Sequence, residues 1–293
     1  MDEHQAAVPR IGVPRGLAER AREFAAGGRT PAVPRDAATV ILLRQAPDVE
    51  AFLLRRTDAL EFAPGACVFP GGSVDERDGD GQIGETCWAG RSPAEFAGWL
   101  NTSAERARAL VCAAVRETFE ESGVLLAGPS PTELVQDSAT LALDRRSLLD
   151  GSCSLAELLS RRGLVLRADL LTPWARWVTP EFSPRRFDTW FFASPMPPGQ
   201  VTAVTGIGVG PGHEPAESVS GTWIKPSDAL EAARAGQITL LPPTAVTLAE
   251  LAGHQDVAGI LAQRRVITPL LPRVVIEQER AWLALPEAAK YPL

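Results

Sequence analysis

Two apolar segments in the first quarter of the chain predict β-strands. Segments 38–44 and 49–55 are rich in β-forming residues, and Ala46-Pro47-Asp48 between them indicates a turn, so together they predict a hairpin. A third strand is predicted at 67–69, where the chain runs into a tight turn at Gly71-Gly72. The ordered part of the chain is therefore expected to begin as a small sheet.

A long helix with one apolar face is predicted from residue 103 to residue 122. Thr102-x-x-Glu105 predicts a capping box at its start, and Gly123 marks the left-handed position that ends it. Apolar or small residues recur at helical spacing and should face the sheet: Ala107, Leu110, Val111, Ala114 and Thr118.

The rest of the chain mixes strands and helices. Further helices are predicted at 16–26, 93–100, 226–235, 243–253 and 257–264, with one or two more within 129–173. Strands are predicted at 176–178, 189–193 and 222–224, a hairpin or edge strand at 274–285, and loops at 75–93 and 201–215. This order predicts an α/β protein of the α+β type, a mixed sheet with helices on both sides.

One large domain is expected to account for most of the chain. Residues 1–35, with several prolines, predict a partly flexible N-terminal arm without a core of its own. Residues 36–293 are predicted to form a single domain, with insertions at about 79–102 and 129–173 and a helical and strand extension at the C-terminus. The length of 293 residues suits one large domain or two small ones.

Charge, cysteines and apolar runs restrict the class of protein. A net charge of −7 argues against a general nucleic-acid binder, which is normally basic. Four widely spaced cysteines without a Cys-x-x-Cys pair predict reduced thiols rather than a zinc ribbon or redox pair. The apolar runs are too short to span a bilayer and the N-terminus lacks a signal-peptide pattern, so a cytoplasmic protein with no membrane contact is expected.

Three carboxylates sit in the last turn of the predicted long helix. Glu117, Glu120 and Glu121 follow an i, i+3, i+4 spacing, which places them on one face. A solvated helix face is the ordinary interpretation of such a run. The negative end of the helix dipole makes this an unfavourable place for three acids, however, so a hard divalent cation such as Mg²⁺ is the simplest reason for them.

Phe69-Pro70-Gly71-Gly72 and the run from Arg116 to Val124 together resemble the Nudix box, Gly-x5-Glu-x7-Arg-Glu-(aliphatic)-x-Glu-Glu-x-Gly-(aliphatic). Gly72 matches its first glycine. The second half is matched by Arg116, Glu117, Glu120, Glu121, Gly123 and Val124. Asp78 stands in place of the first Glu, Thr118 at an aliphatic position, and the 37 residues 79–115 replace the seven-residue spacer. The split box resembles the branch that contains the peroxisomal coenzyme A diphosphatases and their bacterial relatives.

The resemblance implies an α/β/α sandwich and hydrolysis of a diphosphate in a small nucleotide-linked substrate. It implies Mg²⁺ or Mn²⁺ as the cofactor, held by Glu120, Glu121 and the Gly71 carbonyl. Glu117 is implied as a ligand or as the base, and Glu120 shares the catalytic role. Glu217, from a distant loop, is expected to complete the metal site. Arg116 is expected to pair with a box carboxylate and hold the turn rigid.

The resemblance leaves the substrate open between two classes. Arg56, Thr57 and Gly65 fit the upstream pattern of the coenzyme A branch, whereas Leu54 and Glu61 depart from it. Coenzyme A or acyl-coenzyme A is therefore the favoured substrate, with Arg56 and Gly72 as candidate contacts. An ADP-ribose, dinucleotide or nucleotide-sugar pyrophosphatase is the alternative.

A protein of another class also fits the resemblance, namely a binding or regulatory protein that keeps the scaffold without hydrolysis. The intact Arg-Glu-x-x-Glu-Glu run favours an enzyme. The oligomeric state stays open, with a homodimer compatible with the sequence. The Gly206-x-Gly208-x-Gly210-x-Gly212 run lacks the strand and helix of a phosphate-binding loop, and predicts a flexible loop.

Overall fold

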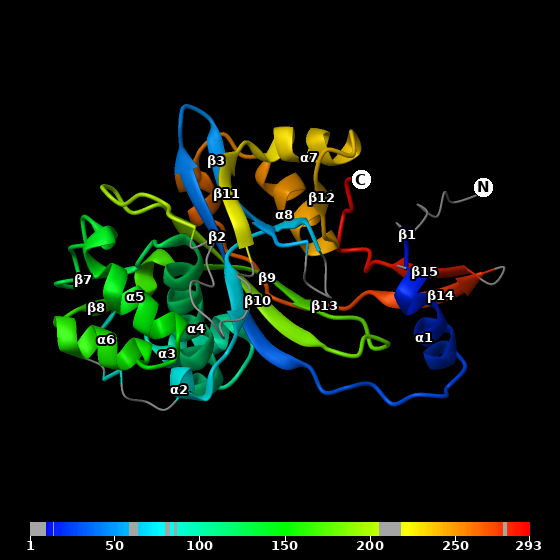
Figure 1. Cartoon of the computed structure of the whole chain (residues 1–293), viewed down its shortest axis with the longest axis horizontal. Helices are drawn as coiled ribbons and strands as arrows, with labels where there is room; N and C mark the ends of the chain where they lie inside the picture. Colours follow the sequence, from blue (N-terminus) through cyan, green and yellow to red (C-terminus); the bar gives the residue numbers. More distant parts are fainter. Residues whose placement is uncertain are drawn as a thin grey trace.

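A computed structural model describes residues 10–13, 15–58, 64–79, 83–84, 87–204, 218–277 and 280–293 (Figure 1). The candidate site residue Glu217, the departing residue Glu61 and the glycine-rich run 206–212 lie outside these residues. No helix in the described part of the chain is long and apolar enough to cross a membrane.

The centre of the molecule is a mixed sheet of nine strands among the described residues. Its main path runs β12-β4-β3-β2-β10-β9-β13, with β11 on β3 and β5 on β2. The bounds are β2 Arg35–Gln45, β3 Val49–Arg56, β4 Ala66–Val68, β5 Gly71–Ser73, β9 Thr172–Val178, β10 Phe187–Pro195, β11 Ser218–Ile224, β12 Thr239–Leu240 and β13 Pro269–Leu270.

The predicted hairpin is confirmed, although its strands pair only near the turn. Leu43 faces Ala51 and Gln45 faces Val49 in antiparallel register. Beyond these pairs the two strands diverge, and each takes other neighbours. β2 pairs with β5 on that side and with β10, in parallel, over its length, while β3 pairs with β4 and β11. This divergence opens room for β5 directly beside β2.

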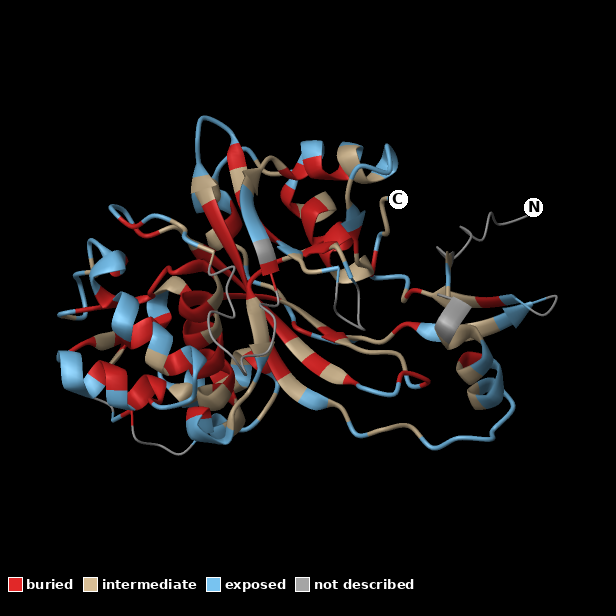
Figure 2. Ribbon diagram, in the orientation of Figure 1, coloured by how far each residue is buried: buried red, intermediate tan, exposed pale blue. Residues whose placement is uncertain are grey.

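Helices cover both faces of the sheet, as the sequence predicts. Alternate residues of one strand enter two separate cores: Val40 and Leu42 pack with α4, whereas Ile41 and Leu43 pack with α7 and α8. The helices have the bounds α3 Pro93–Leu100, α4 Ala104–Ser122, α7 Pro226–Arg234, α8 Pro242–Leu251 and α9 Val257–Leu261. Figure 2 shows the buried residues along the sheet and on the sides of the helices that meet it. The α/β/α sandwich is therefore confirmed.

A helical subdomain packs beside α4, where residues 129–173 predict an insertion. It contains η2 Ser138–Leu141, α5 Ala142–Leu149, α6 Leu155–Arg162 and η3 Ala168–Leu170. A small sheet in the order β6-β8-β7 joins Trp88–Ala89, Val165–Arg167 and Ala127–Gly128. Asp144 connects the two helices by ion pairs of 2.6 Å to Arg161 and 2.7 Å to Arg162.

The two ends of the described chain pack together. β14 Arg273–Glu277 and β15 Arg280–Ala284 form the predicted C-terminal hairpin, and β1 Arg10–Gly12 adds a third strand antiparallel to β15. α1 Arg15–Ala25 lies against β14 and β15 (Figure 1). A small apolar cluster that includes Ala21 and Ala281 holds this unit together. Residues 10–12 and α1, which belong to the predicted N-terminal arm, thus share a small core with the C-terminal hairpin, whereas the sequence predicts no core for the arm.

Three local predictions are wrong. The long helix is capped by Ser103, whose hydroxyl accepts from Arg106 N, and not by Thr102, whose N–H donates to Ala97 O at the end of α3. Gly71-Gly72 belongs to strand β5 rather than a turn, because the diverging hairpin leaves an open edge beside it. The predicted loop 75–93 contains the short helix α2 Glu76–Gly79 and strand β6.

Candidate active site

Helix α4 carries the acidic cluster at its C-terminal end. Its apolar face is fully buried against the sheet, and its last residue precedes Gly123, which adopts the left-handed φ of 74°. With the helix fixed at both ends, residues 116–121 occupy its last turn and a half at the margin of the core. Glu120 is buried here, at 9% exposure, so the acidic run is not an ordinary solvated face.

Arg116 is the centre of the cluster. Its Nε and Nη2 donate to the two carboxylate oxygens of Asp78 at 3.0 and 2.8 Å, a bidentate arrangement. Its Nη1 donates to Glu117 Oε1 at 2.9 Å and to Glu120 Oε2 at 3.1 Å. Nη2 also donates to the Ser73 carbonyl at 2.9 Å. One guanidinium therefore connects strand β5, helix α2 and helix α4.

Asp78 lies beside α4 although 37 residues of sequence separate it from Arg116. Its side chain is only 2% exposed. The N-terminal part of α2 turns the carboxylate inward, where Asp75 N also donates to its Oδ2 at 2.8 Å. The long spacer thus loops out, and both parts of the split box meet at Arg116.

The cluster perturbs the ionisation of its members. Burial raises the pKa of Glu117 to about 7 and also raises the pKa of Glu120. Burial acts in the opposite direction on the Arg116 guanidinium, but hydrogen bonds and charge from Asp78, Glu117 and Glu120 outweigh it and raise the pKa of Arg116. Arg116 therefore stays charged at neutral pH.

The two glycines of β5 let the backbone approach the carboxylates. Gly71 N donates to Glu121 Oε2 at 2.7 Å. A Cβ at Gly72 would collide with the Glu117 carboxylate, and a Cβ at Gly71 would collide with the backbone of Ala38 and Thr39. Only glycine fits at these two positions, so Gly71 and Gly72 allow the Glu117 and Glu121 carboxylates to lie directly against the β5 backbone.

Arg145 is a site residue that the sequence does not reveal. It extends from α5, is 9% exposed, and donates from Nε and Nη2 to the Glu120 carbonyl at 3.0 and 2.7 Å. Burial lowers its pKa to about 10, while the charges of Glu120 and Glu121 oppose this shift. The only sequence signal is general: the last carbonyls of a helix require donors.

The structure brings together most of the predicted site residues. Arg116, Glu117, Glu120, Glu121, Gly71 and Gly72 converge. Arg56 ends strand β3, in register with Ser218 of β11. Glu217 lies outside the described residues.

The donor set fits a hard divalent cation. Within the described residues, no three His, Cys, Asp or Glu side chains form a ready metal site, and three of the acids contact Arg116 instead. Four carboxylates nevertheless lie together at this end of α4: those of Asp78, Glu117 and Glu120, which pair with Arg116, and that of Glu121, which accepts from Gly71 N. The oxygen donors and the negative charge of these side chains suit Mg²⁺ or Mn²⁺.

Comparison with known proteins identifies similar sequences. Residues 100–251 match the family described as the NUDT19 Nudix domain, a span that contains α4 but not Gly72 or Asp78. The acyl-coenzyme A diphosphatase NUDT19 of Gallus gallus is 27% identical, over 74% of this chain and 68% of that protein. The corresponding protein of Xenopus laevis is 28% identical, over 70% of this chain and 60% of that protein.

Two further matches extend the comparison. A putative nudix hydrolase 7 of Caenorhabditis elegans is 30% identical, over 76% of this chain and 62% of that protein. For the Xenopus laevis and Caenorhabditis elegans proteins, the chain spans less than two thirds of the length of the relative. Among solved structures, the Nudix hydrolase of Alicyclobacillus acidocaldarius superposes with a TM-score of 0.60 at 26% identity, over 80% of this chain and 98% of that one.

Proposed function

The chain belongs to the Nudix pyrophosphohydrolases, and from this premise we propose that it is a metal-dependent hydrolase of a nucleotide-linked diphosphate, with coenzyme A or acyl-coenzyme A as the favoured substrate. Two relatives are named acyl-coenzyme A diphosphatases, which supports this choice. ADP-ribose, dinucleotides and nucleotide sugars are the competing substrates. The proposal places the protein in the cytoplasm, without nucleic-acid or membrane partners.

The observation that carries the proposal is the convergence of four carboxylates on one end of α4. Asp78, Glu117 and Glu120 share Arg116, and Glu121 accepts from Gly71 N. A stable fold alone gives no reason to gather three buried or partly buried carboxylates around one guanidinium, because desolvation of each carboxylate costs free energy. Metal binding supplies that reason.

The proposed metal ligands are Glu120, Glu121, Glu117 and the Gly71 carbonyl, with Glu217 as a further ligand. When bound, Mg²⁺ or Mn²⁺ would neutralise the diphosphate and lower the pKa of the attacking water. Gly72 allows the Glu117 carboxylate to lie directly against the β5 backbone, beside the other proposed ligands. Binding at this place competes with the ion pairs of Arg116 to Glu117 and Glu120.

The protein side chains have separate proposed roles in the reaction. Glu117 or Glu120 accepts the proton of the attacking water, since both are buried carboxylates in the cluster. Arg116 holds Asp78 and the box glutamates in position through its bidentate pair. Gly72 allows the substrate to approach, and Arg56 is the proposed contact for a more distant anionic group of the substrate.

The test is product release, by chromatography, from coenzyme A, acetyl-coenzyme A, ADP-ribose, NADH and a diadenosine polyphosphate. Each compound is incubated with Mg²⁺, with Mn²⁺ and with a chelator. Glu121→Gln keeps an oxygen that can accept from Gly71 N but removes the charge. Glu105→Gln, at the exposed start of the same helix, is the matched control.

The proposal requires metal-dependent cleavage that Glu121→Gln abolishes and Glu105→Gln retains. Faster turnover of the coenzyme A compounds than of the others supports the favoured substrate, and the reverse ranking replaces it with the alternative. Metal binding without turnover of any compound would instead favour a binding or regulatory protein on this scaffold.

A further inference from the structure

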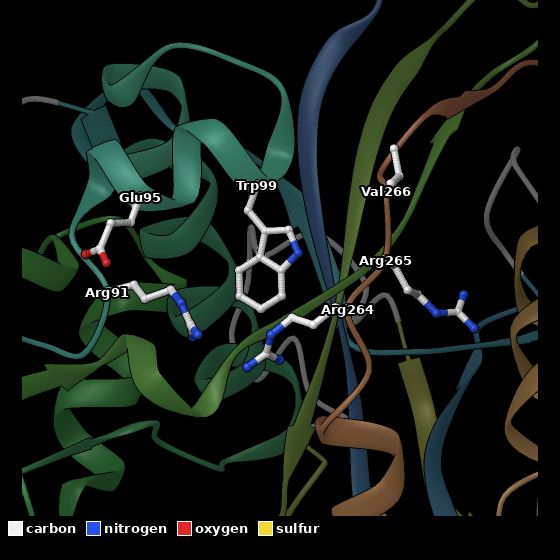
Figure 3. Close-up of a pocket in the computed structure, with 6 residues that line it drawn as sticks. All are labelled: Arg91, Glu95, Trp99, Arg264, Arg265 and Val266. Carbon is white, nitrogen blue, oxygen red and sulfur yellow. The ribbon is translucent and has the colours of Figure 1, made fainter.

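A cavity of about 390 Å³ lies between α3 and the segment that follows α9. Its lining residues are Arg91, Glu95, Trp99, Arg264, Arg265 and Val266 (Figure 3). None of them belongs to the acidic cluster, and the proposed reaction uses none of them. The volume is within the range of small-molecule sites, roughly 300–1,000 Å³.

Trp99 forms a fixed aromatic wall of this cavity. Its ring stacks on Phe96, with centroids 6.2 Å apart and an interplanar angle of 24°. Phe96 is fully buried in the core beneath α3. The capping box of Ser92 and Glu95 and a proline at the first turn fix the start of the helix. The indole is therefore held in place by the core.

Two guanidinium groups from separate parts of the chain lie over this ring. The Cζ of Arg91 is 4.7 Å from the ring centroid and that of Arg264 is 5.2 Å from it. Both side chains extend toward Trp99, whereas Arg265 points away (Figure 3). The two cations come from the loop before α3 and the loop after α9, so the fold brings like charges together.

Neither of these two guanidinium groups forms an ion pair within the described part of the chain, although hydrogen bonds from Ser92 and then the charge of Arg91 lower the pKa of the nearby Glu95. The Glu95 carboxylate accepts from Ser92 N at 2.8 Å and from its hydroxyl at 3.0 Å. Arg265 pairs with Glu250 at 2.7 Å and lies over Trp174. Among the described residues, Arg264 donates to the carbonyl of Gln263, at 3.2 Å. In a chain of net charge −7, this is a local concentration of positive charge.

We propose that Arg91, Arg264 and Trp99 form a binding site for a phosphomonoester, with the phosphate between the two guanidinium groups. Guanidinium groups match phosphate oxygens in geometry and charge, and an added dianion relieves the repulsion between the two arginines. The indole offers apolar surface for the organic part of the ligand. The site is independent of the proposed hydrolase function, and the cavity is large enough for a mononucleotide.

Isothermal titration calorimetry tests the site on the full chain, freed of metal ions by passage over a chelating resin. The probes are inorganic phosphate, adenosine monophosphate and adenosine, in a buffer of low ionic strength because salt screens such contacts. The variants are Arg91→Ala, Arg264→Ala and Arg264→Met, the last of which keeps an aliphatic stem over the ring. Arg146→Ala removes an exposed arginine of α5 as the matched control.

The expected result is binding of phosphate and adenosine monophosphate, but not of adenosine. Each variant of Arg91 or Arg264 should weaken this binding by about tenfold or more, and Arg146→Ala should leave it unchanged. Tighter binding of the nucleotide than of phosphate identifies a phosphorylated organic ligand, and equal binding identifies free phosphate. Absence of phosphate binding to the wild-type chain, or binding that the arginine variants leave intact, overturns the proposal.

Discussion

The Arg145 guanidinium donates two hydrogen bonds to the backbone carbonyl of Glu120, at 3.0 and 2.7 Å. This contact joins α5, in the helical subdomain, to the last turn of the helix that carries the acidic cluster. A helix C-terminus has unpaired carbonyls and a partial negative charge, both of which disfavour nearby acids. Arg145 supplies donors and positive charge at that place, so the subdomain stabilises the proposed metal site.

Replacing Arg145 with Ala should lower both stability and activity. Loss of hydrogen bonds from a charged donor to a buried carbonyl should reduce the free energy of unfolding by about 2–3 kcal/mol. Urea denaturation measures this loss, and kcat/KM measures the effect on the reaction. Arg145→Lys should restore part of both, because it keeps the charge but not the two-donor geometry. Arg146→Ala, one residue along and exposed, should change neither; equal effects of Arg145→Ala and Arg146→Ala would contradict a role in positioning α4.

Removing the guanidinium at the centre of the cluster should be more damaging. Arg116→Ala leaves the Asp78 carboxylate, 2% exposed, without its bidentate partner. An uncompensated buried charge of this kind costs about 3–5 kcal/mol. The double variant Arg116→Ala with Asp78→Asn should recover part of that loss, since it also removes the buried charge. Differential scanning calorimetry should give the highest Tm for the wild type, an intermediate Tm for the double variant and the lowest for Arg116→Ala. A double variant less stable than Arg116→Ala would refute the explanation.

Gly72→Ala should abolish activity, because the new Cβ would displace the Glu117 carboxylate from its place against β5. Gly98→Ala is the matched control, since no atom lies within 4 Å of a Cβ at that helical position. Alanine is a better helix former than glycine, so the control should raise the free energy of unfolding by about 0.5–1 kcal/mol with unchanged turnover. Full activity in Gly72→Ala would show that the reaction does not need the Glu117 carboxylate to lie against Gly72.

Sequence patterns predict the elements whose signals are local. Helix α4 begins one residue after its predicted start and ends where Gly123 predicts, because capping residues and helical spacing lie within the element itself. The hairpin 38–55 follows from its turn and its β-forming residues. The carboxylates of α4 could be identified for the same reason, since their spacing alone places them together.

Three features that depend on distant segments could not be predicted from the sequence. Strand β5 consists of two glycines and a serine, and exists because the β2–β3 hairpin diverges beside it. The pairing of β1 with β15 joins opposite ends of the chain. Arg145 lies 25 residues from Glu120, in an insertion whose position no local pattern determines. Tertiary packing decides each of these three features.

Acid should weaken the connection between α5 and α6. Burial acts to raise the pKa of the Asp144 carboxyl, but hydrogen bonds from Arg162 and Arg161 outweigh it, and the net shift is downward. A lowered pKa in the folded state means that the ionised form stabilises the protein above the unfolded pKa, about 3.9. That contribution disappears as the pH falls through the folded value.

Asp144→Asn should therefore have a lower free energy of unfolding than the wild type at pH 7, and the two free energies should converge below pH 4. The difference at pH 7 should be about 1 kcal/mol, since both arginines are about half exposed and solvent screens the pairs. Urea midpoints at pH 7, 5 and 3.5 measure it. A constant difference over this range would show that the Asp144 charge is not the cause.

Addition of the metal should stabilise the folded chain. An ion that binds only the folded state adds about 2.7 kcal/mol at a concentration of 100 times its Kd, so Mn²⁺ and Mg²⁺ should raise the Tm and a chelator should reverse the rise. Glu120→Gln should reduce this increase strongly, because it removes one of the proposed ligands. Glu105→Gln removes a charge from the other end of α4 and should keep the full increase. If both variants respond to metal as the wild type does, the ion binds elsewhere and the acidic cluster requires another explanation.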